Sequence, residues 1–137
     1  MRTLQSISQK TESKFPWEET PKKGDLGKIL LLYPVTGMDL AGVNVGLPLS
    51  CLYLGTVLEK VGYRVEILDE RLTNSFGQEV AESINRERPV LVGISSMTGI
   101  QIQGGLEGAR AVRSIDPSVP LVWGGVHPSL CPDTTLK

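Results

Sequence analysis

The stretch "VLVGISSMTGIQIQGGLEGARAVRSIDPSVPLVWGG", residues 90–125, decides the fold. It begins with the apolar run "VLVGIS", passes through a loop of small residues, and enters a segment with helical periodicity over Ile100–Ile115. A turn with two prolines then leads to a second apolar run, "PLVWGG". Two apolar strands joined by a helix predict a parallel β-α-β unit whose strands are covered on both faces.

The same alternation precedes this stretch. "KILLLYP", from Lys28, is continuously apolar, whereas "RVEILDE" alternates apolar and polar residues. A helix is predicted between them from about Leu47 to Val61, and "GQEVAESINRER" predicts a polar amphipathic helix that ends before Pro89. Sheet-facing positions in the first and third helices are predicted to be Cys51, Leu54, Leu58, Val61, Ile102, Leu106, Ala109 and Val112.

This order of elements predicts an α/β protein with a doubly wound parallel sheet, Rossmann-like or flavodoxin-like. The alternating second strand suits a sheet edge, which favours the strand order 2-1-3-4. No fifth strand follows "PLVWGG", and "CPDTTLK" predicts only the start of a helix. Because an apolar fourth strand on an open edge is usually avoided, we expect a chain that is truncated after this strand or pairs with another.

Composition and charge fit one domain with a polar extension. The chain has 137 residues and a net charge of −1, so no basic excess indicates nucleic acid. Residues 1–27 are polar and lack a sustained period, which predicts a flexible leader before a single domain over residues 28–137. Apolar runs are too short to cross a membrane, and we expect a cytoplasmic protein. Cys51 and Cys131 lack metal-type spacing.

Small residues fill the three loops that leave the carboxyl ends of the predicted strands. These loops are Pro34–Gly46, Ser95–Gly99 and Gly124–Pro128. Each alone suits an ordinary turn of a doubly wound fold. Together they favour a large ligand pressed against the backbone, because ligands of such sheets bind outside the carboxyl ends of the strands.

Several nucleotide and catalytic motifs do not fit. Gly37, Gly42 and Gly46 lack the G-x-G-x-x-G spacing of a dinucleotide site, so Asp69 is interpreted as a solvated strand end. A phosphoacceptor domain would need acidic residues after the first and third strands, and neither strand has them. A P-loop is absent, and the single histidine does not support a catalytic triad.

The run "VGISSMTG…VPLVWGGVHP" resembles the cobalamin-binding domain family. That family carries an S-x-L motif after its third strand and a Gly-Gly pair after its fourth. Here Ser95-Ser96-Met97 takes the first place, with Met for Leu, and 28 residues separate Ser95 from Gly124-Gly125. The resemblance implies that the glycine pair and the serine line a slot for the flat base of the cofactor's nucleotide tail. The Ser95 hydroxyl would bond a nitrogen of that base.

One departure from the family concerns the lower face of the cofactor. The best-known members carry D-x-H-x-x-G after the first strand, and its histidine ligates cobalt. If Gly46 is the motif glycine, Val43 takes the histidine position and Ala41 the aspartate position, and neither ligates a metal. The resemblance therefore implies histidine-independent, base-off binding. This pattern, with "ILLLYP" and "GGVHP", is similar to the N-terminal domains of cobalamin-dependent radical S-adenosylmethionine (SAM) enzymes.

The resemblance implies methylcobalamin as cofactor and methyl transfer as the reaction of the whole enzyme. In that family a following barrel uses a C-x-x-x-C-x-x-C motif to bind a [4Fe–4S] cluster beside SAM, and this chain lacks the motif. We expect the chain to carry cobalamin and to depend on a radical SAM domain or partner chain for catalysis. A non-catalytic cobalamin sensor or carrier, and a flavodoxin-like domain for another nucleotide, remain alternatives.

The resemblance also implies roles for individual residues. His127, in a loop before a proline, is predicted to contact the edge of the cofactor rather than to ligate cobalt. Ser96 and Thr98 have a second interpretation, because their hydroxyls suit the N-terminal cap of the third helix. No residue is predicted to be catalytic or to ligate a metal. The predicted cofactor-binding residues are Val43, Gly46, Ser95, Ser96, Met97, Thr98, Gly124, Gly125 and His127.

Overall fold

The computed structural model describes residues 26–38 and 46–135, so the predicted leader lies almost wholly outside the described residues. Four parallel strands form one sheet in the order β2-β1-β3-β4. The strands are β1 (Lys28–Tyr33), β2 (Arg64–Asp69), β3 (Leu91–Ser95) and β4 (Leu121–Gly124). The helices are α1 (Leu49–Val61), α2 (Phe76–Arg86), α3 (Ile100–Ile115), α4 (Val126–Leu130) and α5 (Pro132–Thr135), and η1 (Glu70–Leu72) is a 3-10 turn. The predicted α/β doubly wound fold and its strand order are confirmed.

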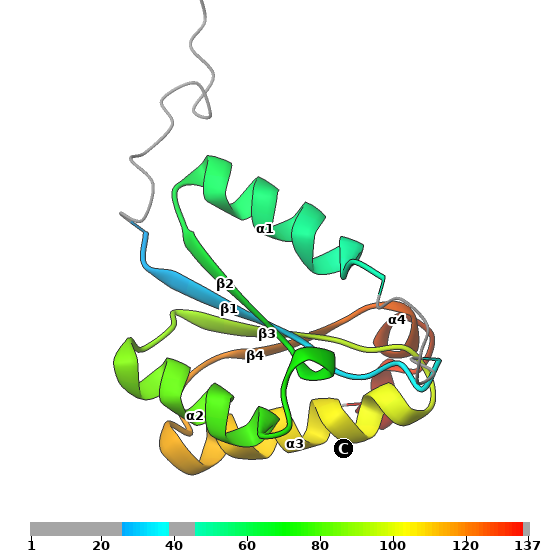
Figure 1. Cartoon of the computed structure of the whole chain (residues 1–137). Coiled ribbons are helices and arrows are strands. Elements are labelled where there is room, and N and C mark those ends of the chain that lie inside the picture. Colours follow the sequence, from blue (N-terminus) through cyan, green and yellow to red (C-terminus); the bar gives the residue numbers. More distant parts are fainter. Residues whose placement is uncertain (1–25, 39–45, 136–137) are drawn as a thin grey trace, which may run out of the picture.

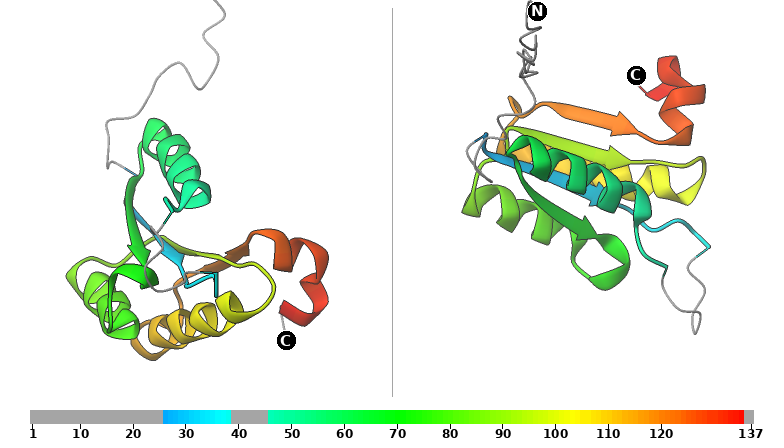
Figure 2. Two further views of the ribbon diagram at one scale, coloured as in Figure 1. Left: turned by 45° about the vertical axis from the view of Figure 1, so that its right-hand side comes forward. Right: turned by 90° about the horizontal axis from the view of Figure 1, so that it is seen from above.

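Helices lie on both faces of the sheet, as a parallel sheet requires. Figure 1 shows α1 on one face and α2 with α3 on the other. The two views in Figure 2 show that α1 lies over the β1 and β2 side, while β4 forms the opposite edge beside α4. Within the described part of the chain, no helix covers the α1 side of β3 and β4. None of the described helices has the length and apolarity needed to span a bilayer.

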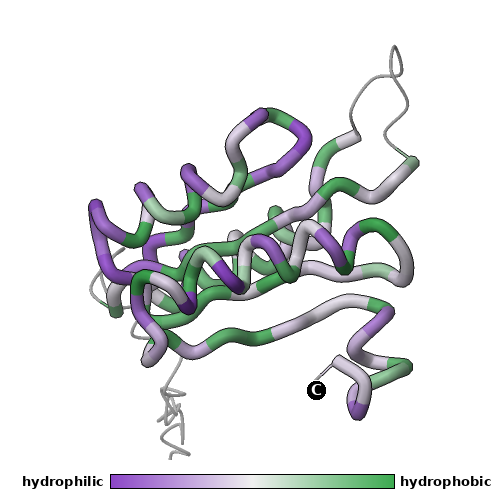
Figure 3. Tube along the Cα trace, turned by 90° about the horizontal axis from the view of Figure 1, so that it is seen from below, coloured by the Kyte–Doolittle hydropathy of each residue, from purple (hydrophilic) through white to green (hydrophobic). Residues whose placement is uncertain are grey.

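Strand β1 contributes to two hydrophobic clusters because its side chains alternate between the two faces. Leu30 and Leu32 belong to the larger cluster, under α2 and α3. Ile29 and Leu31 belong to the smaller cluster, under α1, together with Cys51. Figure 3 shows the strands largely in hydrophobic colours and the helices with alternating hydrophilic positions.

Three glycines form the middle of the buried face of α3, between Gln101 and the correctly predicted Val112. Gly104, Gly105 and Gly108 are buried, and a Cβ on Gly108 would lie 2.8 Å from Leu32 Cδ1. The helix backbone therefore packs directly on the sheet, which accounts for glycines that would otherwise weaken a helix. The predicted inward face was partly wrong, because Leu106 lies to one side of this stripe and is 41% exposed.

The predicted buried face of α1 is correct at Cys51 and wrong at Leu54 and Val61. Cys51 is buried, whereas Leu54 and Val61 are 49% and 48% exposed. The helix instead approaches β2 through Gly55, where an added Cβ would lie 3.3 Å from Val65 Cγ1. Because α1 rests mainly on β1 and β2, its other apolar side chains have no described sheet or helix above them.

An ion pair between the buried Lys28 and the partly exposed Glu66 joins the start of β1 to β2. The Lys28 ammonium, 4% exposed, donates to Glu66 at 3.1 Å and to the Ser83 carbonyl oxygen at 2.7 Å. Ser83 Oγ and Arg86 also donate to the Glu66 carboxylate. Burial raises the pKa of Glu66, but the hydrogen bonds from Ser83, Lys28 and Arg86 outweigh that effect and leave the pKa below its ordinary value.

Glu66→Gln is expected to lower the free energy of unfolding by about 2 kcal/mol at neutral pH, because Lys28 loses its counter-charge. The depressed pKa of Glu66 means that the wild-type contribution is present above the ordinary carboxyl pKa and is lost as pH falls through the folded-state value. Urea unfolding at several acidic pH values measures both effects. The two proteins should converge in stability at low pH, and a constant difference down to pH values where carboxylates are protonated would contradict this role.

Candidate functional site

The two motif residues predicted to act together are neighbours in the sheet. Ser95, at the end of β3, is the register partner of Gly124, at the end of β4. The Ser96 amide donates to the Gly124 carbonyl oxygen at 2.8 Å, and the His127 amide donates to the Ser96 carbonyl oxygen at 3.2 Å. Parallel strands therefore bring together residues that are far apart in the sequence, at the carboxyl edge where such folds bind ligands.

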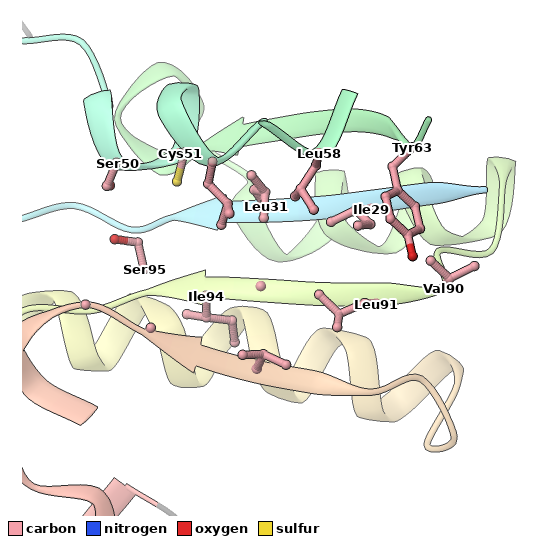
Figure 4. Close-up of a pocket in the computed structure, with 15 residues that line it drawn as sticks. Ile29, Leu31, Ser50, Cys51, Leu58, Tyr63, Val90, Leu91, Ile94 and Ser95 are labelled. Atoms are coloured by element: carbon pink, nitrogen blue, oxygen red, sulfur yellow. The ribbon is translucent and has the colours of Figure 1, made fainter. Parts of the chain in front are cut away.

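A cleft of about 530 Å³ opens on the α1 side of the sheet. Strands β1, β3 and β4 form its floor, and α1 forms a wall through Cys51, Leu54 and Leu58. Figure 4 shows Ser50, Cys51 and Ser95 at one end and Tyr63 with Val90 at the other. Three predicted site residues line this cleft: Ser95, Gly124 and Gly125.

Two glycines on neighbouring strands lower the floor of the cleft. Gly93 lies between Leu31 of β1 and Val122 of β4 in the sheet register. A Cβ on Gly93 would come within 2.9 Å of Leu31 Cδ2, so packing accounts for that glycine. A Cβ on Gly124 would have no heavy atom within 4 Å, so packing does not require glycine there. Its missing side chain leaves open space in the cleft.

Gly93 was not predicted as a site residue, because its strand was predicted only as an apolar run. A signal was present, because a glycine inside a strand often marks close approach by a ligand or by another part of the chain. The wall residues Cys51, Leu54 and Leu58 were likewise not predicted to line a site. Their helical spacing indicated burial, and sequence periodicity does not distinguish a core face from a cleft wall.

Gly125 is required by the backbone. Its φ is +103°, and a Cβ would lie 2.5 Å from the Ser96 carbonyl oxygen. This residue turns the chain directly into α4, and the Ser129 hydroxyl donates to the Gly125 carbonyl oxygen at 2.8 Å. The predicted loop Gly124–Pro128 is therefore wrong beyond Gly125, because His127 lies in a short helix.

Thr98 and His127 form a pair beside the cleft. Thr98 Oγ1 and His127 Nδ1 are 3.2 Å apart, which joins the loop after β3 to α4. Thr98 is exposed and His127 is half-buried. Neither side chain is among those lining the cleft, so the structure brings these two predicted residues near Ser95 and Gly125 without placing them on its surface.

Other predicted site residues lie away from the cleft surface. The Ser96 side chain is buried, and its hydroxyl lies 3.3 Å from the Met97 carbonyl oxygen. Gly46 is exposed and does not line the cleft. Val43 lies outside the described residues. The capping interpretation of Ser96 and Thr98 is wrong, because Gly99 is the N-cap of α3 and no side chain caps that end.

Gln101, which was not among the predicted site residues, joins the two loops that border the site. Its side chain is 1% exposed. The Nε2 group donates to the Pro34 carbonyl oxygen at 2.9 Å, and Oε1 accepts from the Met97 amide at 2.6 Å. The loop after β1 is thereby fixed to the loop after β3. The sequence held one signal for this role: Gln101 has the helical spacing of Gly104 and Gly108, which form the same buried stripe.

The carboxyl end of β2 carries a second ion pair, which is buried. Asp69 and Arg71 side chains are 7% and 5% exposed, and two hydrogen bonds of 2.8 and 2.6 Å join them. The Arg71 guanidinium lies 4.6 Å from the centroid of the Tyr33 ring. Asp69 was predicted to be solvated, which is wrong. Glu70 accepts a 2.9 Å hydrogen bond from the Val35 amide, so this segment also holds the loop after β1.

The cleft surface is apolar and carries few polar groups. Burial raises the pKa of the Cys51 thiol, the Asp69 charge raises it further, and a hydrogen bond with Ser50 opposes them in part, so the thiol is neutral. The remaining side-chain polar groups of the lining are the hydroxyls of Ser50, Ser95 and Tyr63. In the described ranges, no group of three His, Cys, Asp or Glu residues is placed to hold a metal ion. The arrangement suits binding of a largely apolar group.

Comparison with protein families gives a match over residues 41–137 to the B12 binding domain. The chain belongs to the B12-binding domain family. This B12-binding domain is 28% identical over 112 residues to a Pyrococcus horikoshii protein described as an uncharacterized methyltransferase. The aligned region is 80% of this chain and 24% of that protein, so the chain spans about a quarter of its relative. No solved structure matches.

Gln101→Leu is expected to lower the free energy of unfolding by about 2 kcal/mol, because the Met97 amide and the Pro34 carbonyl lose their partner in a buried place. Gln103→Leu, two positions along the same helix and exposed, is the matched control and should change stability little. Denaturant unfolding of both variants measures the difference. Equal stability of the two variants would show that the buried amide does not hold the loops.

Proposed function

We propose that this B12-binding domain holds cobalamin as the cofactor-carrying module of a radical SAM methyltransferase-like enzyme, without a protein histidine on cobalt. The observation that carries the proposal is the pairing of Ser95 with Gly124 at the edge of an apolar cleft. Family membership supports cobalamin as the ligand. A cytoplasmic location also stays a prediction.

The residues of the cleft fit the nucleotide tail of cobalamin, which ends in a flat benzimidazole base. The volume of about 530 Å³ lies within the usual range for small-molecule sites. Open space at Gly124 allows a ring to lie against the backbone. We assign Ser95, Gly124 and Gly125 to the base, with the Ser95 hydroxyl as donor to a ring nitrogen.

The absence of a histidine ligand is supported by the sequence and by the position of His127. This is the single histidine of the chain, and it is not among the residues that line the cleft. Val43, which takes the position of the family's ligating histidine, is apolar. Bound methylcobalamin supplies a cobalt-bound methyl group, and its lower ligand affects how readily that group leaves. The chain's own part is to bind the tail, orient the cofactor and exclude water.

The methyl-transfer part of the proposal rests on the relative and on the resemblance. The Pyrococcus horikoshii relative is described as a methyltransferase and is about four times as long as the aligned region, which is 24% of it. The [4Fe–4S] cluster, SAM and the methyl acceptor are assigned to a radical SAM domain or partner chain. A C-x-x-x-C-x-x-C motif downstream in the reading frame would support this assignment, and its absence would favour a carrier or sensor.

The purified chain is expected to retain methylcobalamin through desalting in the dark, as measured by its visible spectrum. Gly124→Val should weaken binding about ten-fold or more, because the new side chain fills cleft space at a position where an added Cβ has no heavy atom within 4 Å. Thr56→Val, an isosteric change at an exposed position of α1, is the control and should bind as the wild type does. Circular dichroism and thermal unfolding verify that the three proteins fold alike.

Cysteine alkylation gives a second readout for the same proposal. Cys51 lines the cleft, whereas Cys131 is exposed outside it and serves as the internal control. Methylcobalamin should slow alkylation of Cys51 and leave that of Cys131 unchanged. A folded chain that stays colourless, with Cys51 unprotected, would overturn the proposal.

The variant His127→Ala tests whether a protein histidine ligates cobalt on the lower face of the cofactor. We expect the electron paramagnetic resonance spectrum of the cob(II)alamin-loaded chain to lack splitting from a protein nitrogen and to be the same in the variant. The physical reason is that His127 is not among the residues that line the cleft. Nitrogen splitting in the wild type that disappears in His127→Ala would identify a histidine ligand and contradict this part of the proposal.

A further inference from the structure

Polar groups of the cleft lie at its two ends, and its middle is hydrocarbon. Ser50 and Ser95 stand at the carboxyl end, and the Tyr63 hydroxyl stands at the amino end (Figure 4). Between them lie the side chains of Leu31 and Leu58. The floor there is apolar, and Ile29 and Leu31 are 4% and 2% exposed.

The backbone under this middle section offers no free hydrogen-bonding groups on its paired strands. Residues 29–32 of β1 pair with β2 on one side and with β3 on the other. Their amides and carbonyls are therefore occupied by the sheet. The Cys51 thiol is at most a weak donor. A polar atom placed in the middle of the cleft would lose water without gaining a partner.

We infer that this cleft selects corrinoids by their lower base and favours a benzimidazole over a purine. The inference rests on the proposed function and deepens it. A benzimidazole joined to the nucleotide sugar has one free ring nitrogen, which the Ser95 hydroxyl satisfies. The rest of its edge is hydrocarbon and matches Leu31, Leu58 and Leu91.

An adenine in the same place has three free ring nitrogens and an amino group. The Ser95 hydroxyl satisfies one of them. The Ser50 and Tyr63 hydroxyls stand at the ends of the cleft, and its apolar middle offers no partner to the groups that lie there. Burying polar groups without partners is unfavourable relative to leaving them in water. We therefore expect the adenine analogue to bind about ten-fold or more weakly than cobalamin.

Equilibrium dialysis of the 137-residue chain against three methylated corrinoids tests the inference. The corrinoids are methylcobalamin, its analogue with adenine as the lower base, and methylcobinamide, which has no nucleotide. Methylcobalamin should bind most tightly. Equal affinity for the benzimidazole and adenine forms, or for cobalamin and cobinamide, would overturn the inference and leave cobalamin binding intact. Failure of a folded chain to bind any of the three would overturn the proposed function itself.

Matched variants distinguish selection of the lower base from a general change in affinity for corrinoids. Leu91→Gln places an amide in the cleft and should raise the affinity for the adenine form relative to the benzimidazole form. Leu106→Gln, at an exposed position of α3, should leave the ratio unchanged. Leu58→Gln gives a second test on the wall if the strand variant is unstable. Unchanged ratios in both cleft variants would contradict selection by the apolar middle.

Discussion

The need to bury both faces of β1 governs the arrangement of this domain. Its side chains alternate between two clusters, and each requires a cover. On one face the glycine stripe of α3 brings a helix backbone directly onto the sheet at Leu32. On the other face α1 rests on β1 and β2 and leaves β3 and β4 without a helix in the described ranges (Figure 2). The cleft follows from this unequal cover.

Polar side chains join the loops at the carboxyl edge of the sheet to one another. Gln101 fixes the loop after β1 to the loop after β3, and Glu70 fixes the first of these again through Val35. The Ser96 backbone connects the second loop to β4 and α4. Ser95 and Gly124 thus occupy fixed places at the entrance of the cleft. A pre-formed entrance of this kind reduces the entropy lost when a ligand binds.

Much of the fold could be predicted from local patterns. The four strands, their order and the exact span of Ile100–Ile115 follow from apolar runs, helical periodicity and turn residues. The buried faces were less predictable. Leu106 and Leu54 are exposed because neighbouring glycines let the helix backbone pack closely on the sheet. Apolar periodicity does not identify such glycines as buried positions. The helix after Gly125 was missed because a five-residue helix leaves almost no periodicity.

The sequence by itself determined the class of the fold and the two motifs, because strand and helix periods and the separation of Ser95 from Gly124 are properties of the chain alone. Only the tertiary structure decided which glycines are required by packing or by the backbone and which lies beside open space. At Gly93 and Gly125 a Cβ would meet Leu31 and the Ser96 carbonyl oxygen, respectively. At Gly124 a Cβ would enter open space. The physical reason is that the space around a Cα depends on neighbouring strands, and no local pattern records it.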